Sequence, residues 1–316
     1  MISIIVPIYN EEENIPDLYS QLVKVMETVG QPFEIIFVND GSSDGSPEIL
    51  DAISAKDSRA KVLHFGRNFG QTAAFMAGFD TAKGKIIIPI DADLQNDPED
   101  IPALLEKLNE GYDVVSGWRK DRKDASFRRN FLSRVANKLI SLVTGVHLHD
   151  YGCTLKAYRS ELIKSVRLYG EMHRFIPIFI SWHGGRVTEI PVKHHPRVHG
   201  KSKYGLERIF KVILDLLVVQ FLSRYNTKPI YVFGGVGIFS IMISLASFLY
   251  ALYLKVFDSI DFVQTPLLLL VTLTFIMGTM FILMGFIAEM LVRIYYETPN
   301  KTSYYIKGSR NLDTKP

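Results

Sequence analysis

Two long stretches without a charged residue lie in the last third of the chain and constrain its fold most strongly. They run from Pro229 to Leu254 and from Pro266 to Ala288. An α-helix needs about 20 apolar residues to cross the hydrocarbon core of a bilayer, and shorter apolar stretches are typical of buried core helices. Because both stretches exceed the length of a typical core helix, the sequence predicts two membrane-spanning helices.

Charges around the two expected spans predict their orientation. The segment between them carries Lys255, Asp258 and Asp261. The tail after the second span is basic, with Arg293, Lys301, Lys307, Arg310 and Lys315. Short basic segments stay in the cytoplasm, and the apolar run at the N-terminus lacks the basic start of a signal peptide. We therefore expect a multi-pass protein of the plasma (inner) membrane with its large N-terminal part and both termini in the cytoplasm.

Strand-like and helix-like segments alternate from residue 1 to about residue 118. The expected strands are Ile2–Ile8, Phe33–Asn39, Lys61–Phe65, Lys85–Ile90 and Asp113–Ser116. The expected helices are Glu12–Val29, Ser46–Lys56, Gln71–Thr81 and Asp97–Leu108. This alternation predicts an α/β fold with a mostly parallel sheet. Ligands of such sheets lie outside the carboxyl ends of the strands, and three polar segments follow expected strand ends.

The first polar segment carries two carboxylates. Asp91 and Asp93 follow a buried strand with only Ala92 between them. Mg²⁺ and Mn²⁺ prefer oxygen ligands and are commonly shared with substrate phosphates, and Gln95 could add an amide oxygen. The alternative is a solvated turn or an acidic helix start, since Asp-x-Asp alone is common. The position at a strand end favours a divalent metal that would neutralise charge on a leaving diphosphate.

The other two polar segments fit a nucleotide. One comprises Pro7, Tyr9, Asn10 and Glu11 after the first strand, and the other runs from Asp40 to Gly45 after the second. A carboxylate such as Asp40 can accept a hydrogen bond from a base N–H, and glycines let the backbone approach a ligand closely. The alternatives are an ordinary helix N-cap at Asn10 and a loop in which Asp44 caps the next helix.

Basic residues gather in two groups between residues 119 and 203. The first group comprises Arg119, Lys120, Arg122, Lys123, Arg128, Arg129 and Arg134. The second comprises Lys193, His194, His195, Arg197, His199, Lys201 and Lys203. Arginine side chains suit phosphate geometry, so the first group is a candidate phosphate site. A solvated helix face or general attraction to anionic lipid headgroups would also explain it.

Apolar residues recur at helical spacing from Tyr204 to Arg224, with charged residues between them. This pattern predicts an amphipathic helix in the membrane interface, and an ordinary domain helix is the alternative. The expected organisation is a catalytic domain over 1–203, the amphipathic helix over 204–225, a two-span membrane domain over 226–292 and a tail over 293–316.

Together these motifs resemble a known family. The family 2 glycosyltransferases with the Rossmann-like GT-A fold are closely similar in Pro7-Ile8-Tyr9-Asn10-Glu11, Asn39-Asp40-Gly41-Ser42-Ser43-Asp44 and Asp91-Ala92-Asp93-Leu94-Gln95. More narrowly, the chain resembles the polyprenyl-phosphate glycosyltransferases, which include dolichol-phosphate mannose synthases and bactoprenol glucosyltransferases. The segment from Arg197 to Tyr204 matches the Arg-x-x-Gly-x-Ser-Lys element of that subgroup, and the similarity extends to Glu289–Tyr295.

The resemblance implies a role for each matching position. The donor diphosphate and a metal, Mg²⁺ or Mn²⁺, would be held by Asp91, Ala92, Asp93 and Gln95. The nucleotide would be bound by Pro7, Tyr9, Glu11 and Asp40, and a loop would bring Arg197 and Lys203 to the diphosphate. The acceptor phosphate would be bound by Arg119, Arg128, Arg129 and Arg134. Asp150 would orient the acceptor or take its proton.

The reaction implied by the resemblance is inverting transfer of a sugar from a nucleotide-sugar to a membrane polyprenyl phosphate. Similarity to the bacterial subgroup favours UDP as the nucleotide and a homo-oligomer as the assembly. The net charge of only +3 indicates no nucleic-acid partner. The alternatives are another membrane acceptor, or a catalytically silent scaffold that binds nucleotide-sugars. The intact set of Asp91, Asp93 and Gln95 argues against the silent scaffold.

Overall fold

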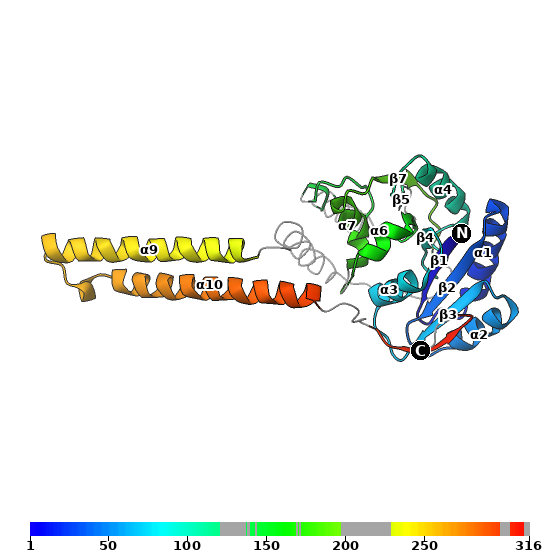
Figure 1. Ribbon diagram of the computed structural model, residues 1–316, viewed down its shortest axis with the longest axis horizontal. Helices are drawn as coiled ribbons and strands as arrows, with labels where there is room; N and C mark the ends of the chain where they lie inside the picture. The colour runs from blue at the N-terminus through cyan, green and yellow to red at the C-terminus, as the bar shows by residue number, and fades with distance from the viewer. Residues whose placement is uncertain are drawn as a thin grey trace. The chain divides into compact units, whose positions relative to one another are not determined.

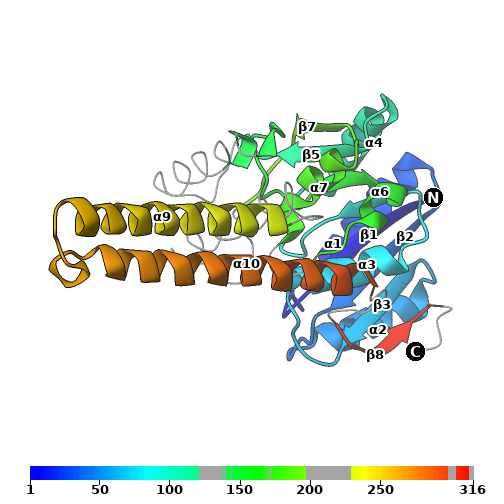
Figure 2. The ribbon, with the colours of Figure 1, turned by 60° about the vertical axis from the view of Figure 1, so that its left-hand side comes forward.

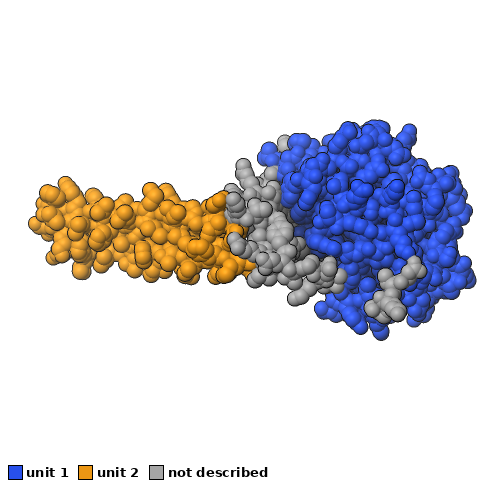
Figure 3. All heavy atoms as spheres, in the orientation of Figure 1, with its two compact units in different colours: residues 1–217, 302–316 blue, residues 218–301 orange. Residues whose placement is uncertain are grey.

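The structure is a computed structural model that describes residues 1–120, 137, 140–142, 144–168, 170, 172–196, 229–297 and 304–312. The chain divides into two compact units, which Figure 3 colours separately. One unit contains residues 1–217 and 302–316, and the other contains residues 218–301. Each unit is described by itself. The predicted amphipathic helix over 204–225 lies outside the described residues, and the predicted domain boundaries stay a prediction.

A mostly parallel sheet forms the centre of the first unit (Figure 1). In the described part of the chain its strand order is β7-β5-β6-β4-β1-β2-β3-β8. The strands are β1 (Ile2–Ile8), β2 (Phe33–Asn39), β3 (Ala60–Phe65), β4 (Ile86–Pro89), β5 (Val114–Trp118), β6 (Lys156–Arg159), β7 (Val187–Pro191) and β8 (Ile306–Arg310). Only β6 and β8 run antiparallel to their neighbours among these strands. The predicted α/β class and mostly parallel sheet are confirmed.

Helices cover both faces of the sheet, and successive side chains of a strand pack against helices on opposite faces. They are α1 (Ile15–Val29), α2 (Ser46–Lys56), α3 (Gln71–Thr81), α4 (Ile101–Asn109), α6 (Ser160–Ser165) and α7 (Ile176–Trp182), with short 3₁₀ turns η1 (Pro98–Asp100) and η2 (Met172–Phe175). Ile4 and Val6 of β1 are fully buried in one core with residues of α1 and α4. Ile5 points to the opposite face, where Gly78 of α3 packs so closely that an added Cβ would lie 2.2 Å from its Cγ2.

The first helix begins at Ile15, so the predicted start at Glu12 was wrong. Pro16 fits the first turn of a helix, because its missing N–H has no partner there in any case. Asn14 occupies the N-cap position, and the N-cap role considered for Asn10 was therefore also wrong. Asn10 instead has a φ of 55°, in the left-handed region that asparagine tolerates.

The segment after the second span returns to the sheet as an edge strand. β8 pairs antiparallel with β3 and places Arg310 opposite Val62 and Gly308 opposite His64. Figure 1 shows β8 in red beside β3. These residues belong to the predicted C-terminal tail, where no strand was expected, since the segment is short and carries little apolar alternation.

The second unit is an antiparallel hairpin of two long helices (Figures 1 and 2). They are α9 (Ile230–Phe257) and α10 (Leu267–Glu297), joined through the 3₁₀ turn η3 (Phe262–Gln264). Gly237 and Gly278 meet at the crossing, where a Cβ on either would lie 2.7 Å from the carbonyl oxygen of the other. Ser244 Oγ donates a hydrogen bond across the interface to the Val271 carbonyl at 2.8 Å. Small residues at such a contact are typical of membrane helices.

The outer faces of the hairpin are apolar and exposed. Only 17% of the apolar window of α9 and 6% of that of α10 are buried among the described residues. A core helix of a water-soluble protein is mostly buried, so the low buried share favours membrane-spanning helices. Both helices are long and apolar enough to cross a bilayer, as the sequence predicted.

Candidate active site

The three predicted polar segments meet at one edge of the sheet. They follow β4, β1 and β2, which are neighbours in the strand order. Because these strands are parallel, their carboxyl ends lie side by side. The structure thus brings together the residues expected to bind metal and those expected to bind nucleotide.

The loops after β1 and β2 are tied to each other by backbone and side-chain hydrogen bonds. The Asn10 N–H donates to Ser42 Oγ at 3.0 Å, and the Ser43 N–H donates to Asn10 Oδ1 at 2.8 Å. The Gly45 N–H donates to Glu12 Oε2 at 2.6 Å. Left-handed geometry at Asn10 is what aims its amide at the neighbouring loop. The two loops therefore form one wall of the site.

Asp44 and the expected nucleotide residues take up the rest of this wall. Asp44 bridges the loops, because it accepts from the Glu12 N–H at 3.2 Å and the Ser46 N–H at 3.1 Å. Tyr9 is 37% exposed, and Pro7 and Glu11 are half-buried. The wall thus includes an exposed tyrosine that a ligand could contact.

Asp40 anchors a third loop that the sequence analysis did not include. Its carboxylate accepts from the Phe69 N–H at 2.6 Å and from the Gly70 N–H at 2.9 Å. Burial raises the pKa of Asp40, and these two hydrogen bonds act against that shift. Gly41 has a φ of 67°, and a Cβ there would lie 2.5 Å from the carbonyl carbon of Arg67. The loop of residues 66–70 therefore packs directly on the loop after β2.

Asp91 is held at the end of β4 by two side chains from elsewhere in the chain. Gln71 Nε2 donates to its Oδ1 at 2.7 Å, and Thr154 Oγ1 donates to its Oδ2 at 2.6 Å. A carboxylate oxygen has two lone pairs, so each keeps one further acceptor direction. Burial, and then the carboxylate of Asp93, raise the pKa of Asp91 to about 6. Asp93 is 8% exposed and accepts from the Gln95 N–H at 3.2 Å.

This arrangement fits a divalent cation. Two carboxylates that disfavour each other's charge would be stabilised by a positive ion between them. The described part of the chain contains no group of three or more His, Cys, Asp or Glu residues placed to hold a metal. Mg²⁺ is commonly bound by one or two carboxylates, with substrate phosphates and water completing its shell. Asp91 and Asp93, with Gln95 half-buried nearby, match that donor set.

The first residues of the second basic group lie beside the segment that carries Asp91, Asp93 and Gln95. His194 forms an antiparallel bridge with Asn96, and the His195 N–H donates to the Gln95 carbonyl at 2.9 Å. His195 Nε2 lies 3.1 Å from Asp97 Oδ2. Arg197 and Lys203 lie outside the described residues. The segment that leads to them starts next to Gln95, however, and His194 is buried there rather than exposed on a loop.

Arg119 and Asp150, which were expected to act separately on the acceptor, form one buried ion pair. Arg119 Nε lies 2.7 Å from Asp150 Oδ2, and Nη2 lies 3.0 Å from Oδ1. Side-chain exposures are 12% and 6%. Such two-pronged pairing fixes the guanidinium plane. Arg128, Arg129 and Arg134 lie outside the described residues.

Comparison with known proteins decides the family. Residues 3–167 match glycosyl transferase family 2. The chain belongs to this family. It is 41% identical to dodecaprenyl-phosphate galacturonate synthase of Rhizobium johnstonii over 97% of this chain and 92% of that one. It is 39% identical to undecaprenyl-phosphate 4-deoxy-4-formamido-L-arabinose transferase of Edwardsiella ictaluri over 97% and 93%.

Two solved structures have a fold similar to that of this chain. Glucosyl-3-phosphoglycerate synthase of Mycobacterium tuberculosis, in complex with Mn²⁺, UDP and phosphoglyceric acid, superposes with a TM-score of 0.53 at 20% identity. The match covers 71% of this chain and 78% of that one. S. aureus TarS 1–349, in complex with UDP-GlcNAc, superposes with a TM-score of 0.51 at 19% identity, over 70% and 66%. The glycosyltransferase thus has the GT-A fold.

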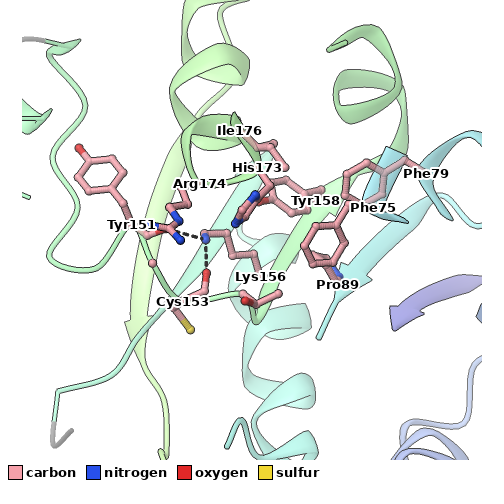
Figure 4. Close-up of a pocket in the computed structure, with 12 residues that line it drawn as sticks. Phe75, Phe79, Pro89, Tyr151, Cys153, Lys156, Tyr158, His173, Arg174 and Ile176 are labelled. Carbon is pink, nitrogen blue, oxygen red and sulfur yellow. Dashed lines mark hydrogen bonds between the residues drawn. The ribbon is translucent and has the colours of Figure 1, made fainter. Parts of the chain in front are cut away.

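A buried lysine holds the turn between Asp150 and Thr154 in this glycosyltransferase. Lys156 Nζ donates to the carbonyl oxygens of Tyr151, at 3.3 Å, and Cys153 (Figure 4). Burial lowers the pKa of Lys156. A small pocket beside it is lined by Phe75, Phe79, Pro89, Tyr151, Gly152, Cys153, Thr154, Lys156, Tyr158, His173, Arg174 and Ile176. The turn delivers one residue to Arg119 and another to Asp91.

Three residues of this site were missed from sequence. Gln71, Thr154 and Lys156 belong to none of the motifs. Gln71 and Thr154 lie far along the chain from Asp91, and Lys156 holds carbonyl oxygens of the turn just before it. Their only signal is a polar residue within an apolar neighbourhood, as in Leu155-Lys156-Ala157, and that signal alone does not indicate a partner.

Proposed function

We propose that this glycosyltransferase moves a sugar from a UDP-linked donor to the phosphate of a membrane polyprenyl phosphate. One observation carries the proposal: the carboxylates of Asp91 and Asp93 share a sheet edge with the nucleotide loops, in a chain that also has a two-helix membrane hairpin. Relatives named for polyprenyl-phosphate substrates align over almost the whole chain, including the hairpin. A soluble acceptor would not require that hairpin.

The donor would lie across the ends of β1, β2 and β4. The walls after β1 and β2 would bind the nucleotide through Pro7, Tyr9, Glu11 and Asp40. Asp91, Asp93 and Gln95 would hold Mg²⁺ or Mn²⁺ with the diphosphate, and Arg197 and Lys203 would reach it from the segment after His195. A bound metal would supply positive charge against the leaving diphosphate. Gln71 and Thr154 keep Asp91 in place for that task.

The acceptor phosphate oxygen attacks the anomeric carbon while the bond from that carbon to the nucleotide diphosphate breaks, with inversion. The ionised phosphate is already a nucleophile, so no strong base is needed. Asp150 uses two N–H groups of Arg119, and the remaining N–H groups of the guanidinium are available to a phosphate. Asp150 therefore acts by orienting Arg119, and the sequence-based role of proton acceptor is not required. Arg128, Arg129 and Arg134 complete the proposed acceptor site.

The antiparallel hairpin and the pairing of β8 with β3 support a cytoplasmic site with both termini on one side of the membrane. If α9 and α10 both span the bilayer, the chain would enter and leave the membrane on the same side. The α/β unit precedes α9, and β8 follows α10 and pairs with β3 of that unit. Basic residues in the tail favour the cytoplasm, so the protein would reside in the inner membrane. The further expectation of a homo-oligomer is tested by the mass of the purified protein in detergent.

The transfer reaction can be tested directly with purified full-length protein. The assay combines undecaprenyl phosphate, Mn²⁺ or Mg²⁺ and a panel of labelled UDP- and GDP-sugars, and it measures label in the organic phase. We expect one donor to label the lipid, and the label to disappear without metal. If the label appeared on another membrane component, that component would be the acceptor in place of polyprenyl phosphate. Nucleotide binding without any transfer would favour the silent scaffold.

A further inference from the structure

The segment of residues 304–311, here called the docked tail, contacts more than the edge strand β3. Asn311 follows β8 with a φ of 56°. Its Nδ2 donates to the carbonyl oxygens of Ser54 at 2.7 Å and Ala60 at 2.9 Å. These bonds connect the tail to the C-terminal part of α2 and to the first residue of β3. The tail is thus fixed at both ends of its strand, and two series of contacts run from it toward the candidate nucleotide site.

The first series starts from the tyrosines at the beginning of the docked tail. The ring of Tyr304 stacks on Phe65 with 5.2 Å between centroids, and Phe65 meets the edge of Phe69 at 5.6 Å. The Gly66 N–H donates to the Tyr305 carbonyl at 3.2 Å. These contacts cover the loop of residues 66–70, whose N–H groups bind Asp40. Displacement of the tail would therefore release the loop that fixes Asp40.

The second series starts from Arg310 at the end of β8. Arg310 Nη2 lies 2.9 Å from Asp51 Oδ2, and Asp51 Oδ1 lies 3.1 Å from His64 Nε2. His64 Nδ1 lies 3.0 Å from Asn39 Nδ2. Since an amide nitrogen can only donate, Nδ1 accepts, and the ring proton on Nε2 is donated to Asp51. The direction of every bond in this series is thereby determined.

Asn39 connects this series of contacts to the loops after β2 and β1. Its Oδ1 accepts from the Ser42 N–H at 2.9 Å, and Ser42 Oγ in turn accepts from the Asn10 N–H. If the Asn39 amide turned over, its nitrogen would face the Ser42 N–H, and two donors would oppose each other. The amide of Asn39 therefore keeps one orientation, in which its Oδ1 accepts from the loop after β2 and its Nδ2 donates to His64.

We propose that the docked tail is a positioning element for the nucleoside diphosphate of the donor, so that its docking sets donor affinity. Two separate series of contacts begin at the docked tail. One reaches the loop of residues 66–70 and the other reaches the loop after β2, and these two loops meet at Asp40. The inference rests on the proposed function insofar as those loops bind the nucleotide.

The test uses full-length protein and UDP with Mn²⁺, measured by titration calorimetry, alongside the donor KM and kcat. Arg310→Ala and Tyr304→Ala each cut one series, and Arg310→Lys keeps a cation for Asp51. Lys307→Ala is the matched control, since Lys307 is exposed on the same strand. We expect UDP affinity to fall and donor KM to rise about 5-fold in each alanine variant, within the range typical of coupled sites. kcat should be unchanged, Arg310→Lys should lie nearer wild type, and Lys307→Ala should match it.

Unchanged UDP affinity in both alanine variants would overturn this proposal, as would a loss that Lys307→Ala shares. A fall in kcat with unchanged KM would also contradict a positioning role. If the wild-type protein binds UDP but transfers no sugar, the proposed function fails, and the tail is still judged by the UDP affinities. If it binds neither UDP nor GDP, the nucleotide site itself is wrong, and this proposal fails with it.

Discussion

The two sides of the sheet edge are built differently. On the proposed nucleotide side, loops that directly follow β1 and β2 bind each other through many hydrogen bonds between backbone N–H groups and side-chain oxygens, such as those of Asn10 and Ser42. On the proposed acceptor side, an ion pair between distant segments holds the geometry, that of Arg119 and Asp150. A single lost contact should therefore weaken the first side gradually. On the second side it should remove the charge that balances a buried ion, which costs far more.

Asp93 is one of the two proposed metal ligands after β4, and its loss should have the largest effect. We expect Asp93→Ala to lower kcat by about 10³-fold, because removal of one group that stabilises developing charge costs 10²–10³ or more. The measurement is the initial rate of lipid labelling with saturating donor. The control is Glu99→Gln. Glu99 is an exposed carboxylate a few residues further along the chain, and it pairs with Lys193. Equal rates for both variants would remove Asp93 from the site.

The second-largest effect is expected from loss of the ion pair between Arg119 and Asp150. Arg119→Met removes the positive charge that balances the buried carboxylate of Asp150, so the free energy of unfolding should fall by about 3 kcal/mol, and the rate of transfer should fall about 100-fold. The double variant Arg119→Met/Asp150→Leu should regain most of the stability, because both charges of the pair are removed together. Thermal unfolding and lipid labelling measure the two quantities. If activity returned together with stability, the pair would be structural only.

On the nucleotide side, Asp40→Asn should have a milder effect. The amide can accept only one of the two N–H groups that the carboxylate accepts, and the other loses its partner. We expect donor KM to rise about 10-fold with kcat little changed, since one unmet hydrogen bond costs about 1–3 kcal/mol. Steady-state kinetics at saturating acceptor provide both values. Glu48→Gln, exposed on α2, should leave both at wild-type values. A fall in kcat alone would show that the two sides are not separable in this way.

The smallest effect is expected in the hairpin, which is distant in sequence from both sides. Ser244→Ala removes the hydrogen bond to Val271, and such bonds between membrane helices contribute about 0.6 kcal/mol on average. Thermal unfolding in detergent should show a slight loss, and donor KM should stay at the wild-type value. A changed donor KM would indicate that the hairpin interface itself reaches the site.

The difference between the two sides also explains what could be read from the sequence. The proposed nucleotide side is encoded in contiguous motifs at strand ends, so the meeting of these motifs at one edge of the sheet could be predicted, and their role in nucleotide binding stays a prediction. Its exceptions are local: the helix start moved from Glu12 to Ile15, because the residues before Pro16 bond to the neighbouring loop. The predicted spans followed from uncharged length alone.

The acceptor side depends on contacts that no local pattern encodes. The pairing of Arg119 with Asp150 and the bond from Thr154 to Asp91 join segments far apart in the chain. A single sequence shows such residues only as isolated polar positions. The edge strand β8 is similar, because five residues with little alternation form a strand only when β3 offers an open edge.

The nucleotide released during the reaction tests the central claim most directly. Transfer of the sugar alone breaks the bond between the anomeric carbon and the diphosphate, so wild-type protein with undecaprenyl phosphate and the preferred UDP-sugar should release one UDP for each glycosylated lipid. Chromatography of the nucleotides and mass spectrometry of the lipid, from one reaction, give both amounts. Release of UMP with a lipid that gained a second phosphate would contradict the account, as would UDP release without a lipid product.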